Sequence, residues 1–551
     1  MNNNNWWKNG VIYQIYPKSF QDTTGSGTGD IQGIIKRLDY IQTLGVDGIW
    51  ITPMYLSPQI DNGYDIANYR EIDPSYGTMA DFEQLIAEAH KRNIKIVMDM
   101  VFNHSSTFHQ WFVEGEDPNS EYHDYYIWRE EPTNWQSKFG GSAWKWSDKA
   151  QKYYLHLFAP EQADLNWENP KLRAELFSIC QFWAEKGIDG LRLDVVNLIS
   201  KPEHFENDEI GDGRRFYTDG PKIHQYLQEL NQKALTPFGL MTVGEMSSTQ
   251  LSHCQQYANL AGTELSMTFN FHHLKVDYPY GEKWTYAQPD YVELKSIFNY
   301  WQNGMHNRAW NALFWCNHDQ PRIVSRFGDE GEYRTISAKM LAMLLHGMQG
   351  TPYIYQGEEI GMTNPNFSTI EAYRDVESLN AYQALLDKRY ESSKILQILG
   401  QKSRDNSRTP VQWDSSLNAG FSTGTPWIDV AKNYLQINVE QAIADKNSVF
   451  YTYQTLIALR KQLAIFTDGN YHDYLPEHPS IWVYQRQTET EKLLVIANLA
   501  KQSQQIELPT EWQHQGVITL LNNYPEQITA TTGNLVLQPY QGIYLYQKQV
   551  G

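Results

Sequence analysis

Cysteine is scarce in this sequence. Only three cysteines occur in 551 residues (Cys180, Cys254 and Cys316), an odd number without the spacing of metal ligands. This count argues against a disulfide-linked secreted scaffold and against a metal site built on thiolates. We expect three buried thiols in a protein of a reducing compartment, the cytoplasm.

Basic charge and long apolar runs are also lacking. The 45 Lys and Arg residues are outnumbered by 64 Asp and Glu, and the net charge of −19 argues against electrostatic binding of nucleic acid or anionic lipid. No stretch approaches the roughly 18 uncharged apolar residues of a membrane span. Residues 1–8 (MNNNNWWK) also lack the apolar core of a signal peptide. We therefore expect a cytoplasmic protein with no nucleic-acid partner and no membrane partner. A monomer is taken as the expected state, although no sequence feature specifies it.

Aromatic residues, in contrast, are dense at 14% (18 Trp, 36 Tyr and 21 Phe). The 41% hydrophobic and 20% charged residues are ordinary for a folded chain and exclude a disordered one. Aromatic rings fill large cores, and they also stack on the apolar faces of sugar rings while their polar tips bond hydroxyls. Composition leaves both interpretations open.

Short, β-rich apolar runs recur along the chain, each followed by a polar loop and then a helical pattern. Such runs are typical of strands buried on both faces. Eight of them, alternating with helices such as residues 79–91, 170–186 and 338–348, predict an α/β fold: a closed (β/α)8 TIM barrel. The eight runs are Val11–Tyr16, Val46–Thr52, Ile94–Val101, Ile188–Val195, Leu240–Glu245, Leu265–Phe271, Ala312–Asn317 and Thr351–Gln356.

Two regions depart from the barrel rhythm. Residues 105–169, after the third strand, are too long for an ordinary loop and have little helical period, which predicts an inserted subdomain. From residue 468 to 551 the pattern alternates with period two, which predicts a C-terminal antiparallel β domain. The catalytic barrel would then comprise residues 1–104 and 170–467.

Ionisable residues gather at the carboxyl ends of the predicted strands, where active sites of such barrels lie. Asp194 ends the fourth run, Glu245 the fifth, and Asp319 follows the seventh. Neighbouring barrel strands lie about 5 Å apart, the separation of the two carboxyls in retaining glycosidases. Asp194 and Glu245 therefore fit a nucleophile and an acid/base.

Arg192 lies two residues before Asp194, on the same strand face, and would keep the nucleophile ionised. Glu245 must begin protonated, which requires a pKa raised by burial or by a nearby negative charge such as Asp319. Asp319 could also accept hydrogen bonds from sugar hydroxyls.

The segments that carry these residues resemble the hallmark regions of the α-amylase superfamily of glycoside hydrolases. They are DMVFNH (99–104), GLRLDVV (190–196), VGE (243–245), NHDQPR (317–322) and, as a fifth region, QADLNW (162–167). Longer strings are similar to the oligo-1,6-glucosidase subgroup, which includes enzymes that hydrolyse trehalose 6-phosphate. These are DNGYDIANY (61–69), NWQSKFGGSAW (134–144), GTPYIYQGEEIGMTN (350–364) and RDNSRTPVQW (404–413).

The resemblance implies that Asp194 is the nucleophile, Glu245 the acid/base and Asp319 the stabiliser of the transition state. It also implies a pocket for the terminal glucose, with an ion pair between Asp61 and Arg408 that admits only a chain end. The residues it assigns to this pocket are Asp61, Tyr64, His104, Phe158, Arg192, His318 and Arg408.

The stretch after the sixth strand bears on the substrate. His272 and Lys275 stand where oligo-1,6-glucosidases carry acidic residues, and Lys283 lies in the same loop. Two changes toward positive charge in an acidic chain suggest recognition of a phosphate. Together with GDGRRFYTDGP (211–221), this stretch resembles the enzymes that act on trehalose 6-phosphate. The alternative is that these are solvated surface lysines.

A metal-binding loop of the superfamily is altered here. Relatives have the pattern DxNxDxxxD, but the central positions are Thr24 and Ser26, which leaves Asp22 and Asp30 as carboxylate ligands. Calcium affinity depends on ligand charge, so we expect this site to be weakened or lost. The chemistry requires no cofactor in either case.

The resulting hypothesis is a retaining, exo-acting α-glucosidase that hydrolyses trehalose 6-phosphate, a sugar phosphate, to glucose and glucose 6-phosphate. The main alternative is an oligo-1,6-glucosidase or dextran glucosidase acting on isomalto-oligosaccharides, and a glucosyl-transferring isomerase is a third. A catalytically silent partner of a membrane transporter does not fit, because the acidic triad is intact.

Overall fold

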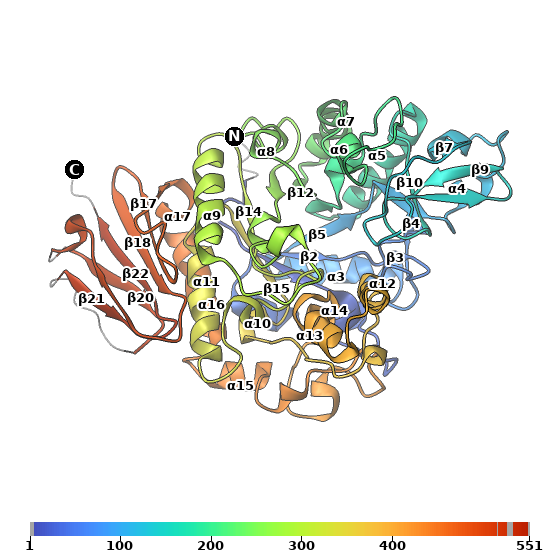
Figure 1. Ribbon diagram of the computed structural model, residues 1–551. Coiled ribbons are helices and arrows are strands. Elements are labelled where there is room, and N and C mark those ends of the chain that lie inside the picture. The colour runs from blue at the N-terminus through green and yellow to red at the C-terminus, as the bar shows by residue number, and fades with distance from the viewer. Residues whose placement is uncertain (1–4, 515, 526–532, 549–551) are drawn as a thin grey trace.

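The computed structural model describes residues 5–514, 516–525 and 533–548 (Figure 1). A central barrel lies between two additions. A C-terminal β-sheet lies on one side of the barrel in Figure 1, and the segment inserted after the third barrel strand lies on the opposite side. The predicted α/β architecture with a C-terminal antiparallel sheet is confirmed.

The barrel strands form one sheet in which each strand runs parallel to its neighbours. In spatial order they are β13 (Met267–Phe269), β12 (Met241–Glu245), β11 (Gly190–Leu193), β5 (Lys95–Met100), β2 (Gly48–Ile51), β1 (Ile12–Ile15), β15 (Thr351–Tyr355) and β14 (Ala312–Leu313). The two end strands meet through a single parallel bridge between Thr268 and Asn311, which closes the cylinder. Each strand lies within one of the eight predicted runs.

Helices cover the outside of the barrel, and local sequence explains where they begin. Thr78 and Asp81 form a reciprocal capping box at α3 (Met79–Lys91), and Asn169 caps α5 (Pro170–Glu185), which has Pro at its first position. Outside the inserted segment, the other α-helices that lie between successive barrel strands are α1 (Ile31–Lys36), α2 (Leu38–Leu44), α6 (Arg214–Tyr217), α7 (Ile223–Leu230), α8 (Leu251–Tyr257), α9 (Tyr291–Met305), α10 (Ile323–Phe327) and α11 (Arg334–His346).

A long excursion follows β15 before the last barrel helix, α16 (Val449–Gln462). It contains α12 (Val376–Asp387), α13 (Ser392–Lys402), α14 (Asp405–Arg408) and α15 (Val439–Ala444). This excursion was not predicted as separate from the barrel, because its helices have the same hydrophobic period as the barrel helices.

The inserted segment is mainly β-structure. β6 (His104–Ser106) pairs with β10 (Gln162–Asp164), and β7 (Trp128–Arg129), β9 (Lys152–Leu155) and β8 (Trp144–Ser147) form a small antiparallel sheet beside α4 (Gln110–Gly115). Its buried cluster includes Trp135 and Trp144 and also Val195 and Leu198, which follow β11. The insertion therefore packs directly against the segment that carries Asp194. The domain boundaries drawn from the sequence stay predictions.

The C-terminal sheet has the order β16 (Asn470–Asp473), β17 (Ile481–Gln487), β18 (Glu491–Asn498), β22 (Gly542–Lys548) and β20 (Ile518–Asn522), all antiparallel. Both of its faces are buried. Trp482 and Tyr484 belong to the barrel's core cluster, whereas Ile481 and Val483 belong to a second cluster. The second face is covered in part by the small sheet of β19 (Gln504–Glu507) and β21 (Asn534–Leu537), which contributes Ile506 and Leu537.

Candidate active site

The strand register places the two candidate catalytic carboxyls side by side. Arg192 of β11 is level with Val243 of β12, so Asp194, two residues on, is level with Glu245. Adjacent strands lie about 4.8 Å apart, which agrees with the roughly 5 Å separation used by retaining enzymes. On the other side of β11, Arg192 is level with Asp99 of β5.

Arg192 holds this group together. Its Nη1 donates to Asp99 Oδ1 at 2.8 Å and to Asp194 Oδ1 at 2.6 Å, and its Nη2 donates to Glu245 Oε2. The guanidinium is buried and lies 5.0 Å from the centroid of the Trp50 ring. One fixed cation therefore positions both candidate catalytic carboxyls, and Asp99, which the sequence analysis did not assign, fixes the cation.

The two carboxyls, Asp194 and Glu245, differ in their protonation states. The pKa of Glu245 is raised to about 8, mainly by burial and also by the negative charges of Asp194 and Asp319, although Arg192 opposes the rise. Burial also raises the pKa of Asp194, to about 7, against the lowering by Arg192. The carboxyls share a hydrogen bond that favours the proton on Glu245 and the charge on Asp194. This is the starting state that acid-assisted attack requires.

Asp319 is ionised in the same site. Burial alone would raise its pKa, but the positive charges of Arg404, Arg408 and Arg192 hold that pKa far below the ordinary value. Arg408 Nη2 donates to Asp319 Oδ1 at 2.6 Å. The Asp319 side chain is 29% exposed, compared with 10% for Asp194, so it has the freest access to a ligand.

His318 is a neutral donor aimed into the site. Gln14 Nε2 donates to His318 Nδ1 at 2.8 Å, which leaves the ring proton on Nε2, 3.4 Å from Asp319 Oδ2. The ring is stacked between Tyr16 and Tyr64, with centroid distances of 6.0 and 5.2 Å. Burial lowers the pKa of His318 to about 3, so the imidazole stays uncharged.

The remaining residues predicted for the sugar pocket lie around this group. Tyr64 donates from its hydroxyl to Asp99 Oδ2 at 2.9 Å. His104 Nε2 lies 3.1 Å from the carbonyl of Tyr64, and Phe158 packs 5.1 Å from the His104 ring. Gln162 Nε2 donates to Asp61 Oδ2 at 3.1 Å. All seven predicted pocket residues are thus brought together at the carboxyl end of the barrel.

The predicted ion pair between Asp61 and Arg408 is wrong. Asp61 Oδ1 accepts from Arg404 Nη2 at 3.1 Å, whereas Arg408 bonds Asp319 and the carbonyl of His318. Both arginines belong to the segment RDNSRTPVQW (404–413), and they lie one helical turn apart at α14. The arginine nearer the start of that turn faces Asp61, and the later one faces deeper into the barrel.

Arg404 is a pocket residue that the sequence analysis missed. It donates to Asp375 from Nη2 at 2.6 Å and lies 3.4 Å from Asp319 and 3.6 Å from Glu377. Its guanidinium also lies 4.8 Å from the ring of Phe139, which comes from the inserted segment. Phe139 in turn packs against Phe158 at 5.6 Å. The insertion and α14 therefore meet across the mouth of the site.

The backbone directly after the candidate nucleophile is strained. Val195 has φ 35° and ψ 40°, a left-handed conformation that β-branched residues rarely adopt. Its side chain is nevertheless buried in the cluster shared with the insertion. Packing of that side chain thus holds a turn that presents Asp194 to the site.

The three residues predicted to bind phosphate do not behave alike. Lys275 is exposed and has no carboxylate partner among the described residues. His272 lies between Thr249 and Trp301, with its Nε2 2.9 Å from the Thr249 carbonyl, so its ring proton is already used. Burial lowers the pKa of His272, with help from Lys275. The histidine is thus neutral beside a free lysine.

Lys283, in contrast, is neutralised. Its Nζ donates to both oxygens of Glu377 at 2.7 Å, and Glu377 raises the pKa of Lys283 although burial opposes it. Arg404 lies 3.6 Å from the same carboxylate. Lys283 is therefore part of the network that fixes Arg404.

The altered metal loop is satisfied by protein donors. Asp22 accepts hydrogen bonds from the amides of Thr24, Gly25 and Gly27 and from the hydroxyl of Ser422. Asp30 caps α1 through the amide of Gly33 at 2.7 Å. An ion would face N–H groups rather than oxygen ligands, so these residues do not fit calcium. Elsewhere in the described ranges, no three His, Cys, Asp or Glu residues cluster as metal ligands.

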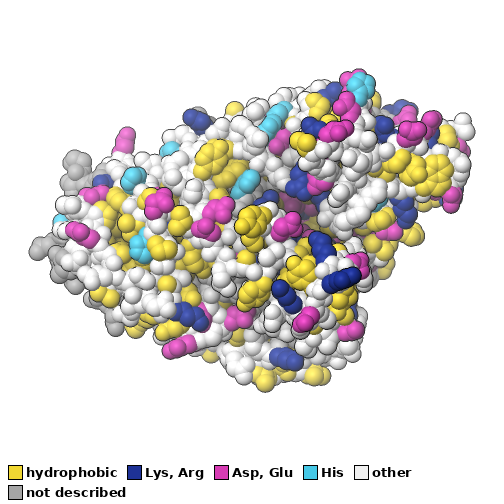
Figure 2. Space-filling view, viewed as in Figure 1, with side chains coloured by type: hydrophobic (Ala, Val, Ile, Leu, Met, Phe, Trp, Pro, Cys, Tyr) yellow, Lys and Arg dark blue, Asp and Glu magenta, His cyan; other side chains and the backbone are white. Residues whose placement is uncertain are grey.

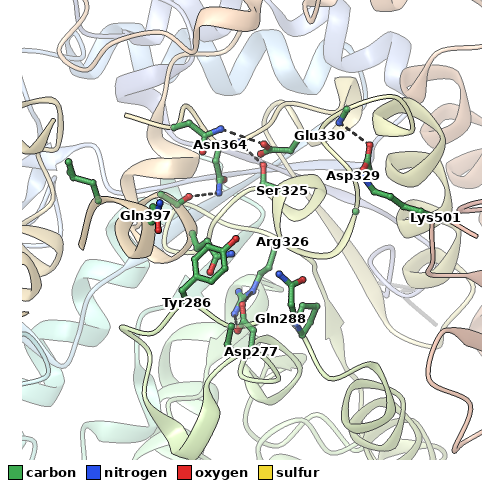
Figure 3. A pocket seen from close by; sticks show the side chains of 18 of the residues that line it. Asp277, Tyr286, Gln288, Ser325, Arg326, Asp329, Glu330, Asn364, Gln397 and Lys501 are labelled. Carbon is green, nitrogen blue, oxygen red and sulfur yellow. Dashed lines mark hydrogen bonds and ion pairs between the residues drawn. The ribbon is translucent and has the colours of Figure 1, made fainter. Parts of the chain in front are cut away.

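Charged side chains gather around a hollow between the inserted segment and α12 in the space-filling view (Figure 2). A separate cavity of about 1240 Å³ lies elsewhere, beside the C-terminal sheet. Its cations are paired, Arg326 with Asp277 and Lys501 with Asp329 (Figure 3). It contains none of the candidate catalytic carboxyls.

None of the described helices is both long enough and apolar enough to span a membrane. The three cysteines are free and buried.

Comparisons with known proteins agree with this geometry. The sequence profile of the family "Alpha amylase, catalytic domain" matches residues 14–469, and that of "Alpha-amylase SusG C-terminal domain" matches residues 481–543. The chain is 62% identical to the trehalose-6-phosphate hydrolase of Escherichia coli K12, over 98% of this chain and 99% of that protein. It is 48% identical to an oligo-1,6-glucosidase of Halalkalibacterium halodurans, over 98% and 99%.

A solved structure resembles the whole fold. The trehalose-6-phosphate hydrolase of Bacillus licheniformis, crystallised as a variant with a bound ligand, has a TM-score of 0.96 and 53% identity, covering 99% of this chain and 100% of that one. Since the catalytic-domain profile covers most of its length, the chain belongs to the α-amylase family of glycoside hydrolases.

Proposed function

We propose that this enzyme hydrolyses the α,α-1,1 bond of trehalose 6-phosphate and releases glucose and glucose 6-phosphate with retention of configuration. The observation that carries the proposal is that the adjacent carboxyls Asp194 and Glu245 occur together with Lys275, a lysine in the loop after β13 that has no carboxylate partner within the described ranges. The relatives at 62% and 53% identity that are named trehalose-6-phosphate hydrolases support it.

The first step forms a bond between Asp194 and the anomeric carbon of the terminal glucosyl unit. Asp194 attacks as a carboxylate, and Glu245 transfers its proton to the oxygen that leaves with glucose 6-phosphate. The raised pKa of Glu245, about 8, keeps this proton available at neutral pH. Arg192 keeps the attacking carboxylate ionised and fixed.

The second step breaks the glucosyl ester. Glu245, now ionised, takes a proton from water, which attacks the anomeric carbon and releases Asp194. In both steps positive charge develops on the glucosyl ring, and ionised Asp319 lies where it could stabilise that charge and accept hydrogen bonds from ring hydroxyls. Neutral His318 would donate to the same ring.

The pocket favours cleavage of a terminal glucose. Asp61 and Arg404 form an ion pair across one side of the site, and Phe139 and Phe158 pack together on the neighbouring side. A glucosyl unit with further residues beyond it would have to displace this buried pair. We therefore infer exo-action.

Charge favours a phosphorylated leaving group. In a protein of net charge −19, most cations close to the site are paired with carboxylates, as Lys283 is with Glu377. Lys275 is left for a ligand, and a compact ammonium is suited to a phosphate. Because a dianionic sugar does not cross membranes unaided and the three thiols are free, we infer a cytoplasmic enzyme. Both catalytic steps use only side chains of this chain and water, so the proposed mechanism requires no cofactor.

A comparison of substrates tests the proposal. Purified enzyme would be assayed on trehalose 6-phosphate, trehalose and isomaltose, with kcat/KM as the readout. We expect trehalose 6-phosphate to be cleaved fastest. Faster cleavage of isomaltose would instead identify an oligo-1,6-glucosidase.

Replacing Lys275 tests the cause of that preference. Lys275→Ala should lower kcat/KM on trehalose 6-phosphate by about tenfold to a hundredfold, the worth of one hydrogen bond to a charged group. Its effect on p-nitrophenyl α-glucoside should be at least ten times smaller. Lys388→Ala, which removes an exposed lysine directly after α12, is the matched control. Equal losses on both substrates would contradict a role in phosphate recognition.

A further inference from the structure

Lys138 lies in the loop of the inserted segment that reaches the mouth of the site. Its amide donates to the carbonyl of Leu157 at 2.8 Å, which ties the loop to its own subdomain. The next residue, Phe139, packs on Phe158 and lies beside Arg404, and its carbonyl accepts from Asn380 of α12. The backbone of the loop is therefore held at Lys138 by the inserted segment and at Phe139 by α12.

The Lys138 ammonium is directed toward the acid/base side of the site. Its Nζ lies 3.3 Å from the hydroxyl of Ser247, two residues after Glu245, and 5.6 Å from the Tyr217 ring centroid. Ser247 is itself held by reciprocal bonds with Asn197. A departing group protonated by Glu245 would leave past this ammonium.

Lys138 has no ion-pair partner in the part of the chain that the structure describes. The neighbouring cations are different. Arg214 forms a bidentate pair with Asp212, and Arg215 is paired with Asp208. Lys138 and Lys275 thus remain as two unpaired ammonium groups, contributed by different segments of the chain.

These two lysines repel each other. The pKa of Lys138 is lowered to about 8, mainly by burial and also by the charges of Arg214 and Lys275, while Asp212 and Glu245 oppose the lowering. Burial and Arg214 also lower the pKa of Lys275. The positive charge of Lys275 thus disfavours the charge of Lys138 when no anion is bound, and a dianion bound by both lysines would offset this repulsion.

We propose that Lys138 binds the 6-phosphate of the leaving glucose together with Lys275, and that the inserted segment thereby sets substrate specificity. This inference rests on the proposed function. Lys138 would contact the ligand directly, while His272, whose ring proton is already bound to Thr249, would contribute little charge. A purely structural role would need only the aliphatic stem against Tyr217, which methionine can replace.

The experiment compares Lys138→Met, Lys138→Arg and the parent enzyme on trehalose 6-phosphate and on p-nitrophenyl α-glucoside. For Lys138→Met we expect kcat/KM on trehalose 6-phosphate to fall about tenfold to a hundredfold, mainly through KM. The loss on the chromogenic glucoside should be at least ten times smaller, and Lys138→Arg should restore part of the binding. Lys145→Met, which removes an exposed lysine of the same insertion, is the control and should change neither substrate.

A second measurement uses glucose 6-phosphate and glucose as competitive inhibitors of hydrolysis of the chromogenic substrate. The parent should bind glucose 6-phosphate more tightly, and Lys138→Met should lose most of that difference. The combination with Lys275→Ala should cost less than the product of the single losses, because both lysines bind one phosphate.

The outcomes separate the two proposals. A parent enzyme that does not favour trehalose 6-phosphate over isomaltose would overturn the proposed function itself. A parent that does favour it, with Lys138→Met equally impaired on both substrates or unimpaired on both, would overturn only the role of Lys138. Thermal unfolding of each variant shows whether a loss comes from misfolding.

Discussion

A single arginine organises the chemistry at the scale of residues. Arg192 donates to Asp99, Asp194 and Glu245, so the two catalytic carboxyls that we propose share one fixed cation. Neither carboxyl moves without disturbing the other. Burial raises both pKa values, and their shared hydrogen bond assigns the remaining proton to Glu245.

This coupling predicts a narrow pH optimum. Activity requires ionised Asp194, whose pKa is raised to about 7, and protonated Glu245, whose pKa is raised to about 8. The value of kcat/KM should fall as pH drops below about 7, where Asp194 takes up a proton, and as pH rises above about 8, where Glu245 loses one. A pH series on p-nitrophenyl α-glucoside, which has no titrating phosphate, measures both limbs.

A substitution at Glu245 identifies the group responsible for the alkaline limb of the pH profile. Glu245→Gln should greatly reduce activity on substrates that need acid assistance and remove the alkaline limb. An alkaline limb that begins near the ordinary glutamate pKa in the parent enzyme would contradict the protonation states assigned here.

At the scale of elements, the short helix α14 positions two arginines, one at the mouth of the site and one nearer the candidate catalytic carboxyls. Arg404 directly precedes it and Arg408 ends it, four residues apart and therefore on one face. Arg404 binds Asp61 and Asp375 at the mouth, while Arg408 binds Asp319 nearer the reacting carbon. The excursion after β15 thus closes the pocket from the side opposite the insertion.

Removing Arg404 should damage both stability and activity. Arg404→Met would leave Asp61 and Asp375 buried with weaker compensation, and breaking a buried pair of this kind costs about 3–5 kcal/mol. We expect a lower free energy of unfolding in urea and reduced kcat/KM on every glucoside. Arg308→Met, at an exposed position before β14, is the control. Unfolding of Arg404→Met at the same urea concentration as the control would contradict the assigned network.

The elements differ in how far the sequence predicts them. Barrel strands such as β5 and β12 are buried on both faces, so continuous apolar runs identify them, and the capping box of α3 marks its start. The excursion containing α12 and α13 was missed because its amphipathic helices have the same period as barrel helices. A local sequence pattern predicts whether a helix or a strand forms, but not whether a helix packs on the barrel or belongs to an excursion from it.

The positions of the candidate site residues could be predicted where they follow from strand ends, but their ion-pair partners could not, because these depend on tertiary contacts. Asp194 and Glu245 end adjacent strands, so their proximity follows from the order of the strands. The partner of Asp61 could not be derived, since Arg404 and Arg408 are both in reach until the turn is folded. Residues distant in sequence likewise decide whether a lysine has a carboxylate partner. Lys283 pairs with Glu377, whereas Lys275 has no such partner among the described residues.

On the scale of the whole molecule, the barrel and the C-terminal sheet share one core. Alternate residues of β17, such as Trp482 and Tyr484, pack into the barrel's cluster, and the Tyr484 hydroxyl donates to the carbonyl of Leu344 at 2.6 Å. Arg486 donates to the carbonyl of Gly347 at 2.8 Å. The sheet thus covers α11 and supports the side of the barrel that contains β14 and β15.

The single bridge between Thr268 and Asn311 has a consequence for dynamics. β11 and β12 are paired over four residues, but β13 and β14 meet only at this bridge, and Asn311 Oδ1 is buried without a hydrogen-bond partner among the described residues. Local opening should therefore begin here. Amides of β13 and β14 should exchange with deuterium before those of β1 and β2, and equal protection of all four strands would disprove this order.

The loop that follows β13 contains His272 and Lys275, so glucose 6-phosphate bound there should slow exchange along the same edge. Binding of the leaving group and closure of the barrel would then be linked. Release of the product would allow the junction between β13 and β14, which is joined by a single bridge, to open more often.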